Sequence, residues 1–199
     1  MYHKTMLLII CLIFTAPCFV IYADDHSKES RWSNQISNGC DDDTHGKRKH
    51  DRHRDGKHSH NAVRPDSNPV YKAQCGSCHL AYPPELLPES SWLKLLEGID
   101  DHFEESVELD ADSQNTIKSH LISNSADHSS TKQAAKIMNC LNNSTPLRIT
   151  EIPYIIKEHH KINPETFTRK AIGSFSNCAA CHTGAEEGNY DDDNVKIPQ

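Results

Sequence analysis

The sequence is poor in the residues that build large apolar cores. Only 36% of its 199 residues are hydrophobic and 7% are aromatic, and the mean hydropathy is −0.69. This composition excludes a polytopic membrane protein and a coiled-coil rod, and eight glycines are too few for a collagen. Basic residues are also fewer than acidic ones, which gives a net charge of −7. A nucleic-acid backbone is therefore not an expected partner.

Cysteine and histidine are the residues that the chain has in quantity. It contains eight cysteines and 14 histidines. A polar chain of this kind usually takes its stability from disulfides, metals or a cofactor rather than from apolar burial alone. We therefore expect one or two small domains built around such groups.

Residues 1–23 have the pattern of an export signal. Lys4 precedes an apolar run from Met6 to Ile21, and Ala23 supplies a small residue at the cleavage position. The run is short for a membrane-spanning helix and Pro17 interrupts it. We therefore expect cleavage after residue 23, an oxidising compartment, and no stable membrane insertion of the mature chain.

Residues 24–68 are predicted to be disordered, because they show almost no apolar periodicity. Residues 45–60 hold five histidines, six lysines or arginines and two aspartates. A solvated linker is one interpretation of this stretch. Loose binding of Zn²⁺, Cu²⁺ or Ni²⁺ is the other, because neutral imidazoles on a flexible tract chelate such ions. The pattern does not decide between them.

From residue 69 onward the pattern is helical, and no strand alternation is present. One helix is predicted over residues 92–103, with Ser90 as its cap, and a second is predicted after Asp110. A third is predicted to begin at Ser130, where Gln133 completes a capping box. A fourth is predicted to begin at Thr150 and to stop at Asn163. The fold class is therefore predicted to be all-α. We expect two regions, residues 69–130 and residues 131–199, and each contains one C-x-x-C-H motif.

Two C-x-x-C-H motifs decide the expected chemistry. They are Cys75-Gly76-Ser77-Cys78-His79 and Cys178-Ala179-Ala180-Cys181-His182. This motif is typical of covalent c-type haem attachment. The two cysteines reach the two vinyl groups of one porphyrin, and the following histidine then lies under the ring as an iron ligand. We therefore predict two covalent haems, with His79 and His182 as proximal ligands.

Other uses of these cysteines fit less well. The knuckles of a four-cysteine zinc site usually lie about 15–20 residues apart, and here about 100 residues intervene. A thioredoxin-like redox pair would need a βαβ pattern, which is missing. Disulfides within each motif would leave the two trailing histidines unexplained. Outside the motifs, the mature chain has only Cys40 and Cys140, which we predict to form a disulfide if they meet.

Each iron needs a second axial ligand, and histidine is the predicted one. After removal of the expected signal, residues 1–23, Met138 is the only methionine in the chain. His102 and His159 are placed on the apolar faces of their predicted helices. The simplest pairing is His79 with His102 and His159 with His182, because 23 residues separate the members of each pair. Exchange of the distal ligands stays open, and the weaker candidates are His120, His128 and His160.

The chain resembles the dihaem cytochrome c family of Gram-negative bacteria. The stretches that carry the resemblance are CGSCHLAYPPELLPESSW (75–92), GIDDHF (98–103), ITEIPYIIKEHH (149–160) and SFSNCAACHTGAEEGNYDDDNVKIP (174–198). The resemblance implies a small helical fold, two covalent haems and a periplasmic location. It also implies the same four axial histidines, an oxygen-binding monohaem cytochrome c and a b-type membrane cytochrome as redox partners.

The predicted function is one-electron transfer between redox partners, without enzymatic activity. The first rival is a dihaem peroxidase or reductase, or a gas-binding haem protein, which would need one open iron site. The second rival is a metal carrier that uses residues 45–60. Residues 97–112 hold eight acidic residues and no lysine or arginine. They form either a solvated face or a docking patch for a basic partner.

Overall fold

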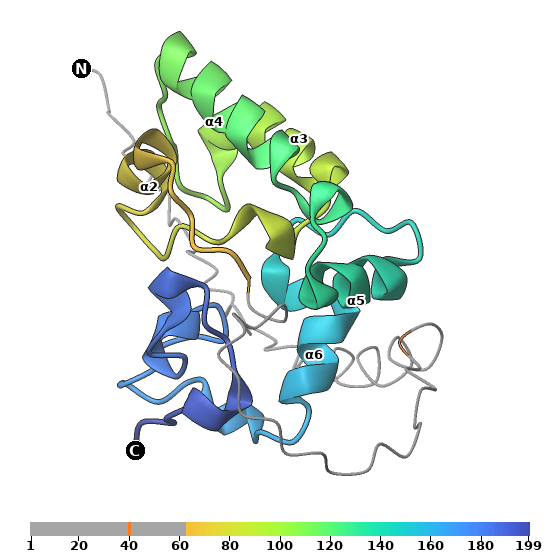
Figure 1. Ribbon diagram of the computed structural model, residues 1–199. Coiled ribbons are helices and arrows are strands. Elements are labelled where there is room, and N and C mark those ends of the chain that lie inside the picture. The colour runs from red at the N-terminus through yellow and green to blue at the C-terminus, as the bar shows by residue number, and fades with distance from the viewer. Residues whose placement is uncertain (1–39, 41–62) are drawn as a thin grey trace, which may run out of the picture.

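A computed structural model describes residue 40 and residues 63–199, and every statement below concerns these residues. Five helices lie in this part of the chain: α2 Pro69–Cys75, α3 Glu89–Glu97, α4 Ala111–Ser123, α5 Lys132–Leu141 and α6 Pro153–His159 (Figure 1). Short 3₁₀ turns join them, and only isolated β-bridges occur among the described residues. The all-α prediction is confirmed.

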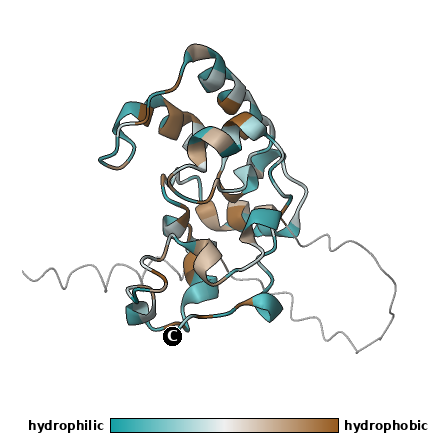
Figure 2. Ribbon diagram, turned by 90° about the vertical axis from the view of Figure 1, so that its left-hand side faces the viewer, coloured by the Kyte–Doolittle hydropathy of each residue, from teal (hydrophilic) through white to brown (hydrophobic). Residues whose placement is uncertain are grey.

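The helices form one apolar core, and the chain beyond α6 adds little to it. The buried cluster takes side chains from every helix from α2 to α5 and from the turn before α6, Ile152 being its last member. In Figure 2 each helix carries both hydrophobic and hydrophilic positions, as packing on one side requires. Residues 160–199 consist of 3₁₀ turns and loops, and from them only Tyr190 packs at the edge of the cluster. This part of the fold has little apolar support of its own.

The structure corrects the predicted helix over residues 92–103. Helix α3 begins at Glu89 and ends at Glu97, with Gly98 as its C-cap. A 3₁₀ turn, Ile99–Asp101, follows, and the chain then reverses through positive φ angles at Phe103 (58°) and Glu104 (77°). His102 therefore lies on a tight turn and not on the apolar face of a helix. The reversal brings the backbone N–H of His102 to Glu105 O at 2.8 Å, a contact that a continuous helix would exclude.

The start of α5 also differs by one residue from the prediction. Its N-cap is Thr131, whose hydroxyl oxygen accepts a hydrogen bond from the backbone N–H of Ala134. The same hydroxyl donates to the carboxylate of Glu85 at 2.9 Å. This second contact, between residues far apart in the sequence, explains why Thr131 and not Ser130 caps the helix.

Glu85 joins three segments in the interior. Its side chain is 2% exposed and accepts hydrogen bonds from the backbone N–H of Arg64 and from the hydroxyls of Ser129 and Thr131. Buried carboxylates require such partners, because an unpaired one would lose its hydration without compensation. Glu85 thus fixes the turn after the first C-x-x-C-H motif against the start of α5.

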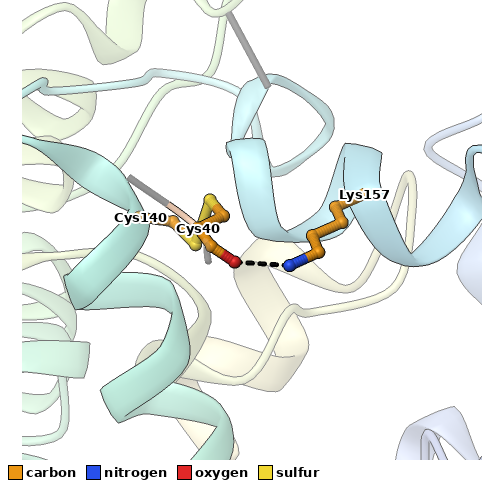
Figure 3. The surroundings of a disulfide bond; sticks show 3 residues. All are labelled: Cys40, Cys140 and Lys157. Atoms are coloured by element: carbon orange, nitrogen blue, oxygen red, sulfur yellow. Dashed lines mark hydrogen bonds between the residues drawn. A yellow bond between two sulfur atoms is a disulfide. The ribbon is translucent and has the colours of Figure 1, made fainter. Parts of the chain in front are cut away.

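The predicted disulfide between Cys40 and Cys140 is confirmed (Figure 3). It joins Cys40 to α5 with the two Cα atoms 4.8 Å apart, and Lys157 of α6 donates a hydrogen bond to the carbonyl of Cys40. Residues 63–68 were predicted to be disordered but are built into the fold: Val63 is 2% exposed, and Asp66 pairs with His120 of α4 at 2.8 Å.

The remaining predictions on the N-terminal part concern residues that the structure does not describe. The expected signal peptide, residues 1–23, and the histidine-rich stretch, residues 45–60, lie there. Within the described part of the chain, no helix is both long enough and apolar enough to cross a bilayer.

Candidate haem sites

The first C-x-x-C-H motif begins where α2 ends. Cys75 is the last residue of the helix, and Gly76 caps it with its N–H directed to Lys72 O at 3.0 Å. An added Cβ at Gly76 would lie 2.3 Å from that carbonyl oxygen, so only glycine fits this turn. His79 ends the motif, and its Nδ1 lies 2.7 Å from Leu80 O. When Nδ1–H donates to this carbonyl, Nε2 is left as the metal-binding nitrogen.

His102 faces His79. Their ring centres are 6.2 Å apart and the ring planes are tilted by only 21°. The tight turn around residues 101–105 supplies His102, whereas the loop after α2 supplies His79. The structure therefore brings together the first pair that the 23-residue spacing predicts.

The second motif forms a 3₁₀ turn, Cys178–Ala180, and closes with the N–H of His182 donating to Cys178 O at 2.8 Å. His159, the last residue of α6, faces His182 with ring centres 6.1 Å apart and planes crossed at 74°. The Nδ1 atom of His159 lies 2.7 Å from Ile155 O, which again leaves Nε2 for a metal. The second predicted pair is thus also brought together.

The ring separations fit one metal ion between each pair. With metal–nitrogen bonds of about 2.0–2.1 Å and about 1.1 Å from each nitrogen to its ring centre, one ion sets the ring centres about 6.3 Å apart. The observed 6.2 Å and 6.1 Å agree with this value. Aromatic rings in direct contact also have centres about 4.5–7 Å apart, so the spacing indicates an iron because each pair contains the histidine of a C-x-x-C-H motif. Both pairs therefore have the spacing of two axial ligands on opposite sides of an iron.

The four motif cysteines are free thiols in the structure, which excludes a disulfide within either motif. Burial, followed by the nearby Asp66 carboxylate, raises the pKa of Cys75 to about 11. Burial likewise raises the pKa of Cys178 to about 11 and that of Cys181 above its ordinary value. These three cysteines are partly buried, whereas Cys78 is exposed.

One histidine of each pair has a pKa below its ordinary value. Burial lowers the pKa of His102, and the neighbouring His79 and Arg148 lower it further. Burial and the neighbouring His159 lower the pKa of His182. A lowered pKa keeps the imidazole neutral near pH 7, and the neutral form is the one that binds a metal.

Aromatic rings surround both pairs. Tyr82 stacks on His79 with centres 5.1 Å apart, and Phe103 meets the edge of His102 at 4.8 Å. His159 lies 5.2 Å from Phe175, and His182 lies 5.4 Å from Tyr190. Such rings are the surroundings that a large flat apolar cofactor needs. Of these four, the sequence interpretation singled out only Phe103, as an apolar helix position, although each lies within a stretch that carries the family resemblance.

Two buried polar atoms near the second motif have no hydrogen-bond partner among the described residues. They are Nδ1 of His182 and the hydroxyl oxygen of Tyr190. Buried polar atoms of folded proteins are nearly always satisfied, so each exception needs an explanation. A porphyrin carries two carboxylate side chains and fits this requirement, since a Tyr190 hydroxyl can donate to a carboxylate.

The weaker ligand candidates have other roles. His120 pairs with Asp66 and also contacts Asn124, and His128 contacts Glu89 at 3.0 Å. His160 is exposed, with its Nδ1 at Lys157 O. Met138 packs against the apolar core. None of these four side chains faces a motif histidine in a ring contact or hydrogen bond of the described structure.

Comparison with known proteins agrees with this geometry. The family model for dihaem cytochrome c matches residues 71–190, which is more than half of the chain. No curated protein matches. A solved structure of a dihaem cytochrome c from Rhodobacter sphaeroides is 39% identical to this chain, with a TM-score of 0.56, and the match covers 62% of this chain and 97% of that one.

A second similar structure is the X-ray structure of a dihaem cytochrome type c from Shewanella baltica OS155. It is 32% identical, with a TM-score of 0.54, over 66% of this chain and 93% of that one. Both matches span nearly the whole of the other protein and most of the described part of this chain. The chain therefore belongs to the dihaem cytochrome c family, which implies two covalently bound c-type haems.

Proposed function

We propose that this protein is a periplasmic electron carrier in which each haem iron is held between two histidines. His79 and His102 serve the first haem, and His182 and His159 serve the second. The observation that carries the proposal is the pair of ring separations, 6.2 Å and 6.1 Å, each matching one iron between two imidazoles. When bound, each haem supplies one-electron cycling between Fe(III) and Fe(II).

The residues around each pair favour electron transfer over ligand chemistry. His79 with His102, and His182 with His159, would hold the two irons, and an iron held by two histidines would have no site left for peroxide, oxygen or another substrate. Carbonyl acceptors at Leu80 and Ile155 hold the rings of His79 and His159 in one orientation. Fixed ligands keep the structural change small when the charge on the iron changes, which is what rapid one-electron exchange requires.

The first haem is the proposed docking point for a redox partner. All eight acidic residues of segment 97–112 are exposed, and His102 lies within that segment. A negative face around one axial ligand attracts a partner with a basic face and orients it toward that haem. We propose an oxygen-binding monohaem cytochrome c and a b-type membrane cytochrome as the partner classes.

A single preparation of the mature protein tests the proposal. Mass spectrometry should show two added haems that resist acid–acetone extraction, and both irons should be six-coordinate and low-spin in both oxidation states. Ready CO binding by the unmodified protein would overturn the proposal and favour the gas-binding or peroxidase interpretation. The rate of electron exchange with a basic partner cytochrome should fall as salt is added, since surface charges are screened over about 10 Å at 0.1 M salt.

A further inference from the structure

We propose that Tyr82 couples the two haem sites, because its ring positions His79 of the first site while its hydroxyl bonds to the segment that carries the second. This inference rests on the proposed assignment of the two haems and goes beyond it by naming the residue between them. The motif analysis did not select Tyr82.

The ring of Tyr82 acts on the first site. It stacks on His79 with centres 5.1 Å apart and planes at 30°. The Nδ1 contact with Leu80 O holds one edge of the same imidazole. The stacked phenol restricts rotation of the ring about that contact. The orientation of His79 relative to His102 therefore depends on Tyr82.

The hydroxyl of Tyr82 reaches the second site. It donates a hydrogen bond to Ser176 O at 2.5 Å, across 94 residues of sequence. The same carbonyl oxygen accepts a bond from the N–H of Cys178 at 3.0 Å, and Cys178 is the first attachment cysteine of the second motif. A continuous route thus runs from the imidazole of His79 through one phenol and one carbonyl to Cys178, the first cysteine of the second motif.

The backbone around Tyr82 is held on both sides. Tyr71, 3% exposed, donates from its hydroxyl to Tyr82 O at 2.8 Å. Two buried prolines, Pro83 and Pro84, follow, and Trp92 donates its indole N–H to Pro84 O at 2.7 Å. Because the backbone cannot easily shift, the side chain keeps both contacts at once. These anchors make Tyr82 a positioning residue with a fixed geometry.

The exchange that this route serves is internal to the protein. With both haems bound, an electron lost by Fe(II) of one would be gained by Fe(III) of the other, so the step would need no external oxidant or reductant. In the half-reduced protein the electron moves back and forth between the two irons. Its rate appears in proton NMR spectra as exchange broadening of the haem methyl lines.

Two variants separate the two parts of the proposal. Tyr82→Phe keeps the ring and removes the bond to Ser176 O, so electron exchange between the haems should slow severalfold while the ferric EPR signal of the first haem stays in place. Tyr82→Leu also removes the stacking, so the EPR signal of the first haem should shift as His79 turns. Tyr154→Phe is the matched control, because it removes the hydroxyl of a half-buried tyrosine that contacts neither histidine pair; both readouts should stay unchanged.

An unchanged exchange rate in Tyr82→Phe would overturn the coupling role. An unchanged first-haem EPR signal in Tyr82→Leu would overturn the positioning role. Failure of the proposed carrier function would give a different result. The protein would then exchange no electrons with any redox partner, although electrons would still move between its two haems. The NMR line shapes need no partner, so the two outcomes are not confused.

Discussion

The two histidine pairs share a spacing but differ in orientation and surroundings. In each pair 23 residues separate the two histidines, and the ring centres are 6.2 Å or 6.1 Å apart. The rings of the first pair are tilted by 21°, whereas those of the second are crossed at 74°. The repeated motif therefore predicts an iron at both sites, but the histidine orientations at the two sites differ.

The difference has a local origin. His102 lies on an exposed acidic turn, with the guanidinium of Arg148 over the adjacent Phe103 ring at 3.7 Å. His159 lies at a helix end, and its ring meets those of Phe167 and Phe175. Both sites have aromatic contacts, and the first site differs by the charged groups beside His102, which can tune a haem potential. The predictions below test this contrast.

Removal of a distal ligand should have the largest effect. His102→Ala and His159→Ala should each open one iron, give a high-spin signal and allow CO binding by about one haem per chain, because an axial position is vacated. Covalent haem should remain in both variants, since the cysteine links are untouched. His160→Ala is the control: this exposed neighbour of His159 should change neither spin state nor CO binding. CO binding in the control would assign the ligand to His160 instead.

Loss of the disulfide should have the second-largest effect, which is on the stability of the protein. Cys140→Ser should lower the free energy of unfolding by about 3–5 kcal/mol, because the bond closes a loop of 100 residues in the unfolded chain. Urea denaturation of the oxidised holoprotein measures this change. Cys40→Ser should match it, since both variants remove the same bond.

The disulfide should also distinguish the two sites. Lys157, which contacts Cys40, lies in the helix that ends at His159. In Cys140→Ser the EPR signal of the second haem should therefore broaden more than that of the first. Equal stability of the variant and the unmodified protein, or a change confined to the first haem, would contradict this prediction.

The angle between the two imidazole planes differs between the pairs, so the unmodified ferric protein should give two different EPR signals. Nearly parallel imidazoles split the iron d-orbitals unequally and should give a rhombic three-feature spectrum for the first haem. Crossed imidazoles leave two orbitals nearly equal in energy and should give one steep feature at larger g for the second. Phe175→Leu should alter only the second signal, because the Phe175 ring lies 5.2 Å from His159. Two superimposable signals would show that the two sites do not differ in ligand orientation.

The charge of Arg148 should have the smallest effect. For a charge about 10 Å from the iron and an effective dielectric constant of about 20–80, the interaction is about 0.4–1.7 kcal/mol, or about 20–70 mV for one electron. Arg148→Gln should lower the potential of the first haem by this amount, because the lost positive charge favoured Fe(II). Lys136→Gln, which removes a cation near Tyr154 instead, is the control. Spectroelectrochemistry measures the potential of each haem, and equal shifts of both potentials in Arg148→Gln would contradict the prediction.

Much of the fold was predictable because its helices have local signals. Asp110 caps α4 through bonds from the N–H groups of Asp112 and Ser113, as the predicted start after Asp110 requires, and Ile117 and Leu121 are buried on that helix. Pro153 lies in the first turn of α6, and the side chain of Asn163 caps the turn that follows. Caps and apolar spacing act over a few residues, so the sequence displays them directly.

The position of His102 was predicted for the wrong structural reason. Apolar spacing extended the helix to Phe103, but the chain turns after Gly98 and reverses at Phe103 and Glu104. The choice of His102 had independent support from the GIDDHF stretch of the family resemblance, and the 23-residue spacing then paired it with His79. A short reversal of this kind depends on contacts made by the folded chain, which apolar spacing does not register.

The sequence alone determined the attachment chemistry, and the tertiary structure decided what distinguishes the two sites. Two cysteines and a histidine within five residues specify a haem link, because covalent geometry fixes which atoms such a short segment can present to one porphyrin. The crossed planes of His159 and His182, and the bond from Tyr82 to Ser176 across 94 residues, depend on packing between distant segments. No local pattern encodes such contacts, since each exists only after the chain has brought its two halves together.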